Sequence, residues 1–301
     1  MSAGRISLLW MAAFVALWTV VELLASGVLS VYSPYQVVWT RYAVHLGLML
    51  AVWGWREPAT LWRTRRPLYQ VARSLLMLGM PASWVVAMQH GVDPEALMAV
   101  FWLSPLLILA LAHVLLGERA PWPIWVAGAL VCLAADLLFL RRSMPALSTL
   151  MLPLGMALSF SLYVVMTRSL RSEPMRANLF YTALGVMLAL APAIPGLWIT
   201  PVPHDLAVMV GVGVLGFGAL YALDRMAAAA PVSLAAPAAC LQLVFTVGAA
   251  GAAGHTHGGW RTATGVLIIV GVALYLWLRE RVLPVRCAGD LGAGIGRSAS
   301  V

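Results

Sequence analysis

The ionisable residues Glu22, Arg41 and Asp136 lie inside apolar stretches of this 301-residue chain. A charge in such a place is costly and marks either an ion pair or a functional site. Glu22 and Arg41 flank a short predicted turn at 29–33, so a helical hairpin would bring them to the same depth, where they could pair. Asp136, near the end of a later apolar stretch, could share their network. The residues are compatible with a structural ion pair, an outer gate or a proton site.

The sequence also contains a glycine motif that would indicate a different chemistry. Gly211, Gly213 and Gly216 spell G-x-G-x-x-G, which in a soluble βαβ unit would bind a dinucleotide. Here the glycines lie in a long apolar stretch without a preceding strand, so we interpret them as positions of close helix packing. There is no Walker motif, and the three cysteines match no metal or redox spacing. We therefore expect no cofactor, no metal and no enzymatic activity.

The composition indicates which elements position these residues. Hydrophobic residues make up 62% of the chain and charged residues only 10%, against about 25% charged in an average soluble domain. Such a chain must face lipid, and each spanning helix needs ~20 apolar residues. The net charge of +8 is explained by arginine-rich loops at a membrane, so we expect no nucleic-acid partner.

The apolar segments and their breaks predict an all-α integral membrane protein with ten transmembrane helices. Proline, glycine and charged residues separate the segments. The predicted helices cover residues 7–28, 35–54, 69–90, 95–116, 122–140, 148–168, 177–197, 205–227, 232–253 and 261–279.

The arginines predict the orientation of these helices. More of them fall in loops on the side of the membrane that holds the N-terminus than in loops on the opposite side. This bias favours a cytoplasmic N-terminus and C-terminus in a bacterial inner membrane. The Arg141–Arg142 pair departs from this bias. Residues 284–301 are rich in small residues and are expected to form a disordered tail.

The chain contains an internal repeat. Pro94 and Pro231 are 137 positions apart, and the same shift aligns Gly117 with Gly254 and Gly128 with Gly265 without a gap. A weaker match relates the first and sixth helices. We predict a five-helix repeat at 5–142 and a second at 147–281. Because five is odd, the second repeat is inverted, which places a substrate site near the midplane between the halves.

The repeat and several motifs together resemble a known family. The motifs are Arg41-Tyr42, the segment from Pro94 to Pro105, and Leu115-Leu116-Gly117-Glu118-Arg119. The chain resembles ten-helix EamA-type members of the drug/metabolite transporter superfamily. In its aromatic content it is most similar to the aromatic amino-acid exporter branch of that superfamily. The second copy departs from the pattern, with His255-Thr256 in place of Glu-Arg and Gln242 opposite Pro105. The resemblance implies a central cavity and alternating access.

The helices that the resemblance places around this cavity carry aromatic and polar side chains. Aromatic walls suit apolar, aromatic or cationic groups. Alternatively, the aromatics face lipid or the interface, and the polar residues hold helices together. The candidate substrate-binding residues are Trp18, Trp84, Phe101, Trp102, Ser159, Tyr163, Tyr221 and Gln242, and the candidate gate or ion pair comprises Glu22, Arg41 and Asp136.

These observations predict a secondary transporter. The leading hypothesis is export of aromatic and other neutral amino acids, or of related small metabolites, through the central cavity. The alternatives are a multidrug or cationic-compound exporter and an intramembrane enzyme. The expected partners are a small amino-acid-like substrate and the lipid bilayer. The sequence leaves the oligomeric state open, with a monomer among the possibilities.

Overall fold

A computed structural model describes residues 1–139, 150–254, 259–283 and 285 of the chain. These residues form helices joined by turns, so the predicted helical class is confirmed. Arg141, Arg142, His255 and most of the predicted 284–301 tail lie outside the described residues.

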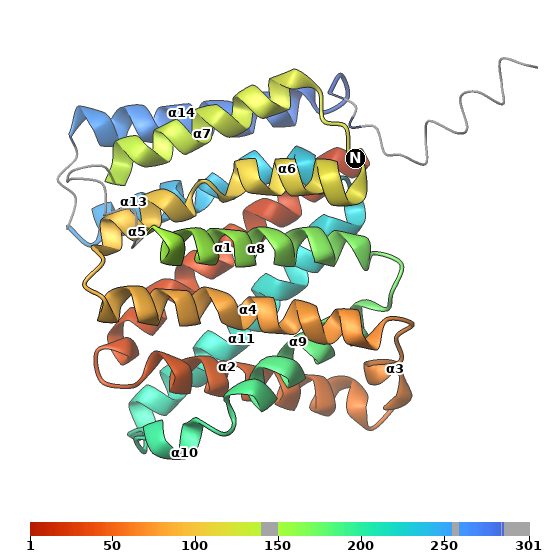
Figure 1. Cartoon of the computed structure of the whole chain (residues 1–301), viewed down its shortest axis with the longest axis vertical. Helices are drawn as coiled ribbons and strands as arrows, with labels where there is room; N and C mark the ends of the chain where they lie inside the picture. The colour runs from red at the N-terminus through yellow and green to blue at the C-terminus, as the bar shows by residue number, and fades with distance from the viewer. Residues whose placement is uncertain (140–149, 255–258, 284, 286–301) are drawn as a thin grey trace, which may run out of the picture.

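Most of the helices lie side by side along one common direction, and α1 and α11 run obliquely to them (Figure 1). The N-terminus, the short helix α3 and the α8–α9 turn lie at one end of the bundle, and the α1–α2 turn lies at the other. The elements are α1 (Ala3–Leu29), α2 (Pro34–Met49), the π-helical turn η1 (Leu50–Gly54), α3 (Ala59–Trp62), α4 (Pro67–Gln89), α5 (Pro94–Phe101), α6 (Ser104–Leu116), α7 (Trp122–Phe139), α8 (Met151–Ser169), α9 (Met175–Leu190), α10 (Ile194–Leu197), α11 (Pro203–Ala229), α12 (Val232–Ala235), the 3-10 helix η2 (Ala236–Cys240), α13 (Leu241–Ala252) and α14 (Trp260–Arg279).

Two helices that the sequence predicts as continuous are broken near their middle. The predicted helix 95–116 divides into α5 and α6, because Pro105 lacks an N–H and its ring clashes with the carbonyl one turn earlier. The Cys132 thiol lies 3.2 Å from the carbonyl oxygen of Trp102, at this break. The predicted helix 232–253 divides in the same way into α12, η2 with Pro237, and α13.

Not every predicted transmembrane helix is long enough to span a bilayer. Within the described part of the chain, seven helical segments have the length and apolar composition needed to cross, counting α5–α6 and α12–α13 as one segment each. The segments at 122–138 and 175–190 are apolar but shorter. The predicted helix 177–197 ends early, at Leu190, and α10 follows as a separate turn. The number of crossings therefore stays a prediction.

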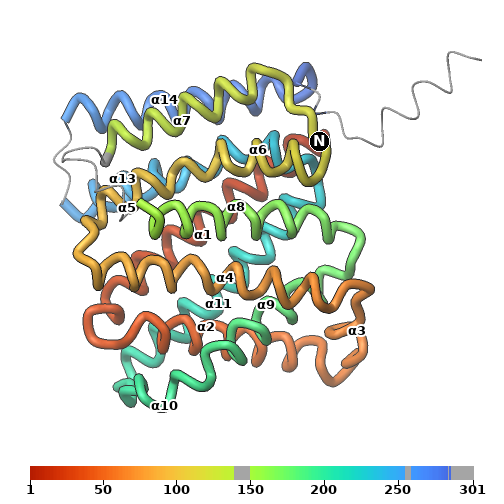
Figure 2. Tube along the Cα trace, viewed as in Figure 1, coloured from red at the N-terminus to blue at the C-terminus, as the bar shows by residue number. Residues whose placement is uncertain are grey.

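The helices of the two predicted halves interleave. Helix α1 packs along α11, and α4 packs along α8 (Figure 2). Helix α2 contacts α11 and α9, α4 also contacts α9, and α6 and α13 contact α8 and α1, respectively. The paired helices α7 and α14 form one edge of the bundle. In the predicted repeat, α1 corresponds to α8 and α11 corresponds to α4. The α1–α11 contact in the structure therefore corresponds to the α8–α4 contact, as two related halves would require.

Equivalent turns also have equivalent backbones. Gly117 ends α6 with φ 64°, and Gly254 follows α13 with φ 74°. Both are left-handed conformations that glycine adopts without steric cost. The sequence matches these two glycines at the 137-residue shift.

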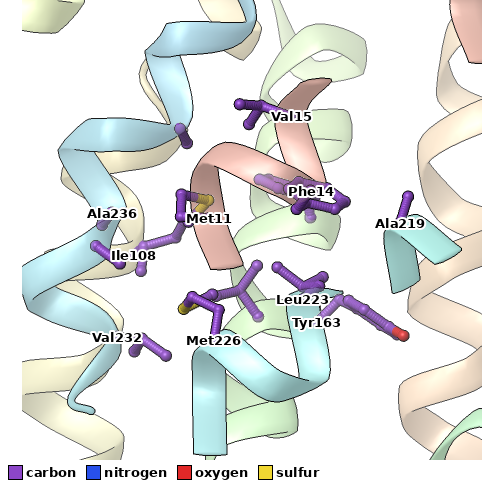
Figure 3. Close-up of a cluster of buried hydrophobic side chains, with 14 of the residues drawn as sticks. Met11, Phe14, Val15, Ile108, Tyr163, Ala219, Leu223, Met226, Val232 and Ala236 are labelled. Atoms are coloured by element: carbon purple, nitrogen blue, oxygen red, sulfur yellow. The ribbon is translucent and has the colours of Figure 1, made fainter. Parts of the chain in front are cut away.

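A buried hydrophobic cluster holds α1, α6, α8, α11 and α12 together (Figure 3). Met11 and Phe14 of α1 face Leu223 and Met226 of α11, with Tyr163 of α8 beside them. All five side chains are buried. This cluster separates the two ends of the bundle.

The sequence predicts close packing at three glycines of α11, and two of them pack closely against α2. A Cβ atom at Gly213 would lie 2.6 Å from Val44, and one at Gly216 would lie 3.1 Å from the Cδ of Arg41. A Cβ at Gly211 would meet nothing within 4 Å. Gly216 thus leaves the space in which the Arg41 side chain lies.

Candidate substrate cavity

A cavity of ≈ 390 Å³ lies between α1, α2, α4, α5, α8 and α13. It extends from Phe14 and Phe160, beside the buried cluster, to Ser26 and Leu29 at the end of α1, where side chains are exposed. Small-molecule sites are typically concave, apolar and ~300–1,000 Å³ in volume. The position and size of this cavity are those of a site for a small metabolite.

One side of the cavity is a continuous aromatic wall. Phe160 of α8 stacks on Phe14 of α1 with ring centroids 6.5 Å apart, and it lies 5.6 Å from Phe101 of α5. Trp102 and Trp18 extend the wall at its two ends, 5.2 Å from Phe101 and 5.9 Å from Phe14, respectively. Aromatic faces attract flat apolar groups and cations.

Four methionines also line the cavity. Met77 and Met80 lie one helical turn apart on α4, Met98 on α5 and Met156 on α8. Trp84 follows Met80 on the same helix and lines the cavity as well. Methionine is flexible and polarisable, so this side can adapt to ligands of different outline.

Glu22 brings a carboxylate to the cavity. One of its oxygens accepts a hydrogen bond of 2.9 Å from the indole N–H of Trp18, one turn earlier on α1. The other accepts a hydrogen bond of 2.8 Å from the Gln242 amide of α13. Glu22 nevertheless keeps an exposed side chain, because it borders the cavity. The carboxylate is held in place and is accessible to a ligand.

Arg41 brings a cation to the same cavity. Its guanidinium lies 5.2 Å from the Trp18 ring centroid and 4.8 Å from that of Tyr42. It donates a long hydrogen bond of 3.4 Å to the Tyr42 hydroxyl, and its buried Nε has no hydrogen-bond partner among the described residues. Arg41 as a whole is only 8% exposed. Its charge is thus positioned by two ring faces.

The predicted pairing of Glu22 with Arg41 is not formed in this structure. Both residues line one cavity, as equal depth would require, but the ion pairs among the described residues do not include them. Trp18 contacts both, with its N–H edge toward Glu22 and its face toward Arg41. Asp136 lies on α7, outside the residues that line the cavity.

Five of the eight predicted substrate-binding residues line the cavity: Trp18, Trp84, Phe101, Trp102 and Gln242. The other three lie elsewhere. Ser159 packs where α8 meets α4, since its hydroxyl would lie 2.6 Å from a Cβ at Gly79. Tyr163 lies under the guanidinium of Arg73, and Tyr221 packs edge-on against Trp10.

Beyond the buried cluster, a polar network joins the halves toward the N-terminal end. Arg73 of α4 is fully buried and lies 3.5 Å from Asp224 of α11. Arg73 also donates hydrogen bonds to Thr167, Thr182 and the backbone carbonyl of Asn178. The neighbouring Arg225 lies over the Trp10 ring.

A second buried ion pair lies near the same end of the bundle. Glu118, in the turn after α6, lies 3.5 Å from Arg168 of α8. It also accepts hydrogen bonds from the backbone N–H groups of Val232 and Ser233 and from the Ser233 hydroxyl, at the start of α12. Next to it is a second cavity of ≈ 450 Å³, bordered by Arg168, Arg171, Pro231 and Glu280. The two ion pairs and the hydrophobic cluster therefore separate the two cavities.

The sequence missed the methionine side of the cavity and the role of Arg73. The methionines gave no signal, because methionine is common in apolar helices and its direction depends on helix rotation. Arg73 could have been found, since it is a cation in a segment predicted to cross the membrane.

Comparison with known proteins shows that part of this chain is similar to a family of transporters. Residues 5–140 match the EamA-like transporter family. The match supports the resemblance to EamA-type transporters over the first predicted half of the chain, and it ends close to the predicted repeat boundary at 142.

Curated relatives of this chain are S-adenosylmethionine uptake transporters. That of Rickettsia conorii is 24% identical over 88% of this chain and 92% of the relative. That of Rickettsia prowazekii is 24% identical over 73% and 74%, and that of Rickettsia bellii is 25% identical over 88% and 93%. These proteins are named for uptake of a nucleoside-containing amino acid, whereas the sequence suggested export of amino acids.

A solved crystal structure is similar to this chain over nearly its whole length. The TM-score is 0.78 at 21% identity, covering 92% of this chain and 98% of the other. The likeness shows that the two chains share a fold.

Proposed function

We propose that this chain is a secondary transporter that carries a small metabolite with a flat aromatic group and a charged end, and that S-adenosylmethionine is the first substrate to test. The observation that carries the proposal is the cavity itself, an aromatic and methionine-lined space that contains one carboxylate and one guanidinium. The names of the relatives direct attention to S-adenosylmethionine, which combines an adenine ring, a sulfonium cation and an amino acid.

The cavity suits the separate parts of such a molecule. An adenine ring can stack on Trp84, which is half-buried at the cavity, and a sulfonium cation is attracted by aromatic faces. The methionine thioethers add a polarisable surface that tolerates different ring shapes. Aromatic amino acids share the flat ring and the charged end, so their transport is the second hypothesis.

We propose alternating access between two inverted five-helix halves, 5–142 and 147–281, each with five crossings. The exchange of helix contacts under the repeat supports this arrangement, and so do the two left-handed glycines and the two broken helices. The substrate cavity and the second cavity would then be the two access routes. The distribution of arginines supports cytoplasmic termini in an inner membrane, so that the cavity beside the α1–α2 turn faces outward.

A counterflow experiment tests the function. Proteoliposomes loaded with unlabelled S-adenosylmethionine, an aromatic amino acid or a cationic drug are diluted into the labelled compound, and exchange is followed over time. We expect exchange of S-adenosylmethionine that empty liposomes do not show, and competition by whichever other compounds share the cavity. Exchange of cationic drugs alone would favour the multidrug hypothesis. No exchange of any compound would refute the transporter function.

A further inference from the structure

We propose that Glu22 and Arg41 form a clamp for the two charges of a free α-amino acid group, and that Trp18 is the positioning residue that keeps them apart. In this arrangement Glu22 binds the α-ammonium and Arg41 binds the α-carboxylate, while the rest of the substrate lies against the aromatic wall. The inference rests on the proposed transport function and narrows its substrate to molecules that carry both charges.

Glu22 has the environment of an ammonium receptor. Its carboxylate is fixed by two hydrogen bonds, one from its own helix and one from Gln242 of the other predicted half. These two neutral donors leave its negative charge uncompensated. Its side chain is exposed and lines the cavity, so a ligand with a positive charge can reach it. A carboxylate has about four acceptor positions, and two of them are left for an ammonium group.

Arg41 has the complementary environment. Its guanidinium is held over two rings and has no carboxylate partner within the residues that the structure describes. Burial of a cation without an acid is costly, and ring faces compensate only part of that cost. A planar carboxylate can accept two parallel N–H bonds from a guanidinium. A ligand carboxylate is therefore the group that would complete this site.

Trp18 explains why the two charges coexist in one cavity without forming an ion pair. Its indole is a single rigid group whose N–H edge binds Glu22 and whose face lies next to Arg41. The acid and the base are thus held at different sides of one ring system. A ligand with adjacent ammonium and carboxylate groups can contact both, whereas a molecule with only one charge leaves one member of the clamp without a partner.

A matrix of variants and ligands tests the clamp. We would measure binding to the full-length protein in detergent for S-adenosylmethionine, its decarboxylated and deaminated analogues, and methylthioadenosine, which lacks the two amino-acid charges and the sulfonium charge. L-phenylalanine, phenethylamine and phenylpropionate form a second series that does not depend on S-adenosylmethionine being the substrate. The variants are Glu22→Gln, Arg41→Gln and Trp18→Phe, with Glu57→Gln and Arg225→Gln as controls whose side chains lie outside the cavity.

The expected result is a charge-specific pattern. Loss of the ammonium should weaken binding to the wild type about 10- to 100-fold, the effect of losing a hydrogen bond to a charged group, and should have little effect on Glu22→Gln. Loss of the ligand carboxylate should likewise weaken binding to the wild type and should have little effect on binding to Arg41→Gln. Trp18→Phe keeps a ring beneath Arg41 but removes the N–H, so it should weaken ligands with an ammonium more than those without. Uniform weakening of every ligand would indicate a merely structural role and overturn the assignment.

The clamp and the transport function fail in different ways. Counterflow of a substrate without the variant–ligand pattern would leave the transport function standing and overturn the clamp. Equal or tighter binding of decarboxylated ligands to the wild type would also overturn the clamp, and would favour a receptor for simple cations. The pattern without any counterflow would support the clamp and refute transport. If Arg41→Gln fails to fold, Arg41→Lys replaces it. The preference for ligands with a carboxylate must then be weaker in Arg41→Lys than in the wild type.

Discussion

The buried Arg73–Asp224 ion pair gives a quantitative prediction. The Asp224→Asn substitution leaves the Arg73 guanidinium fully buried without its counter-charge. Breaking a buried pair from one side costs about 3–5 kcal/mol. Arg73 keeps its hydrogen bonds to Thr167, Thr182 and the Asn178 carbonyl, so we expect the lower end, about 3 kcal/mol.

Thermal unfolding of the purified protein in detergent measures this effect. For a chain of this length, 1 kcal/mol corresponds to a change in Tm of about 2 °C, so Asp224→Asn should lower Tm by about 6 °C. The matched control is the double variant Arg73→Met/Asp224→Leu, which removes both charges. The hydroxyls of Thr167 and Thr182 keep their hydrogen bonds to the carbonyls of Tyr163 and Asn178, so the double variant should recover most of the loss.

Two results would refute this reasoning. A Tm of Asp224→Asn close to that of the wild type would show that the pair contributes little beyond the hydrogen bonds of Arg73. A double variant less stable than Asp224→Asn would show that the side-chain shapes and the remaining polar contacts, and not the uncompensated charge, dominate.

The remaining predictions concern packing around the two cavities. Gly216→Ala places a methyl group 3.1 Å from the Arg41 side chain and should weaken substrate binding, while Gly211→Ala, which meets nothing within 4 Å, should leave binding unchanged; equal binding by both would contradict the role of Gly216. Glu118→Gln removes the charge opposite Arg168 and weakens the hydrogen bonds at the start of α12, so Tm should fall by several degrees. An unchanged Tm would mean that α12 is held by its apolar contacts alone.

The sequence predicted the features that depend on depth and composition. The apolar segments gave the helices, and the short turn between the first two placed Glu22 and Arg41 at one depth, where both line the cavity. The sequence could not predict whether the two charges pair, because that depends on the position of the Trp18 side chain between them. The helix breaks at Pro105 and Pro237 were predictable from proline chemistry but were not predicted.

Tyr163 and Tyr221 are matched to Trp18 and Trp84 by shifts of 145 and 137 residues, respectively. That neither tyrosine lines the substrate cavity has one physical reason. Under the inverted arrangement that we propose, the axis lies in the membrane plane, so it relates a residue near one side of the membrane to one near the other side. Trp18 and Trp84 line the substrate cavity, whereas their mates contact Arg73 and Trp10 instead. In the proposed arrangement, repeat symmetry relates two access routes and does not double the residues of one site.

The most direct test of the account is counterflow of S-adenosylmethionine by two tryptophan variants that differ in position. Trp84 lines the cavity, whereas Trp55 is 85% exposed at the end of η1. The account predicts that Trp84→Ala raises the half-saturating concentration about tenfold, as loss of one aromatic contact of 1–1.5 kcal/mol would do, and that Trp55→Ala behaves as the wild type. Equal transport by both variants would contradict the claim that this cavity is the transport site.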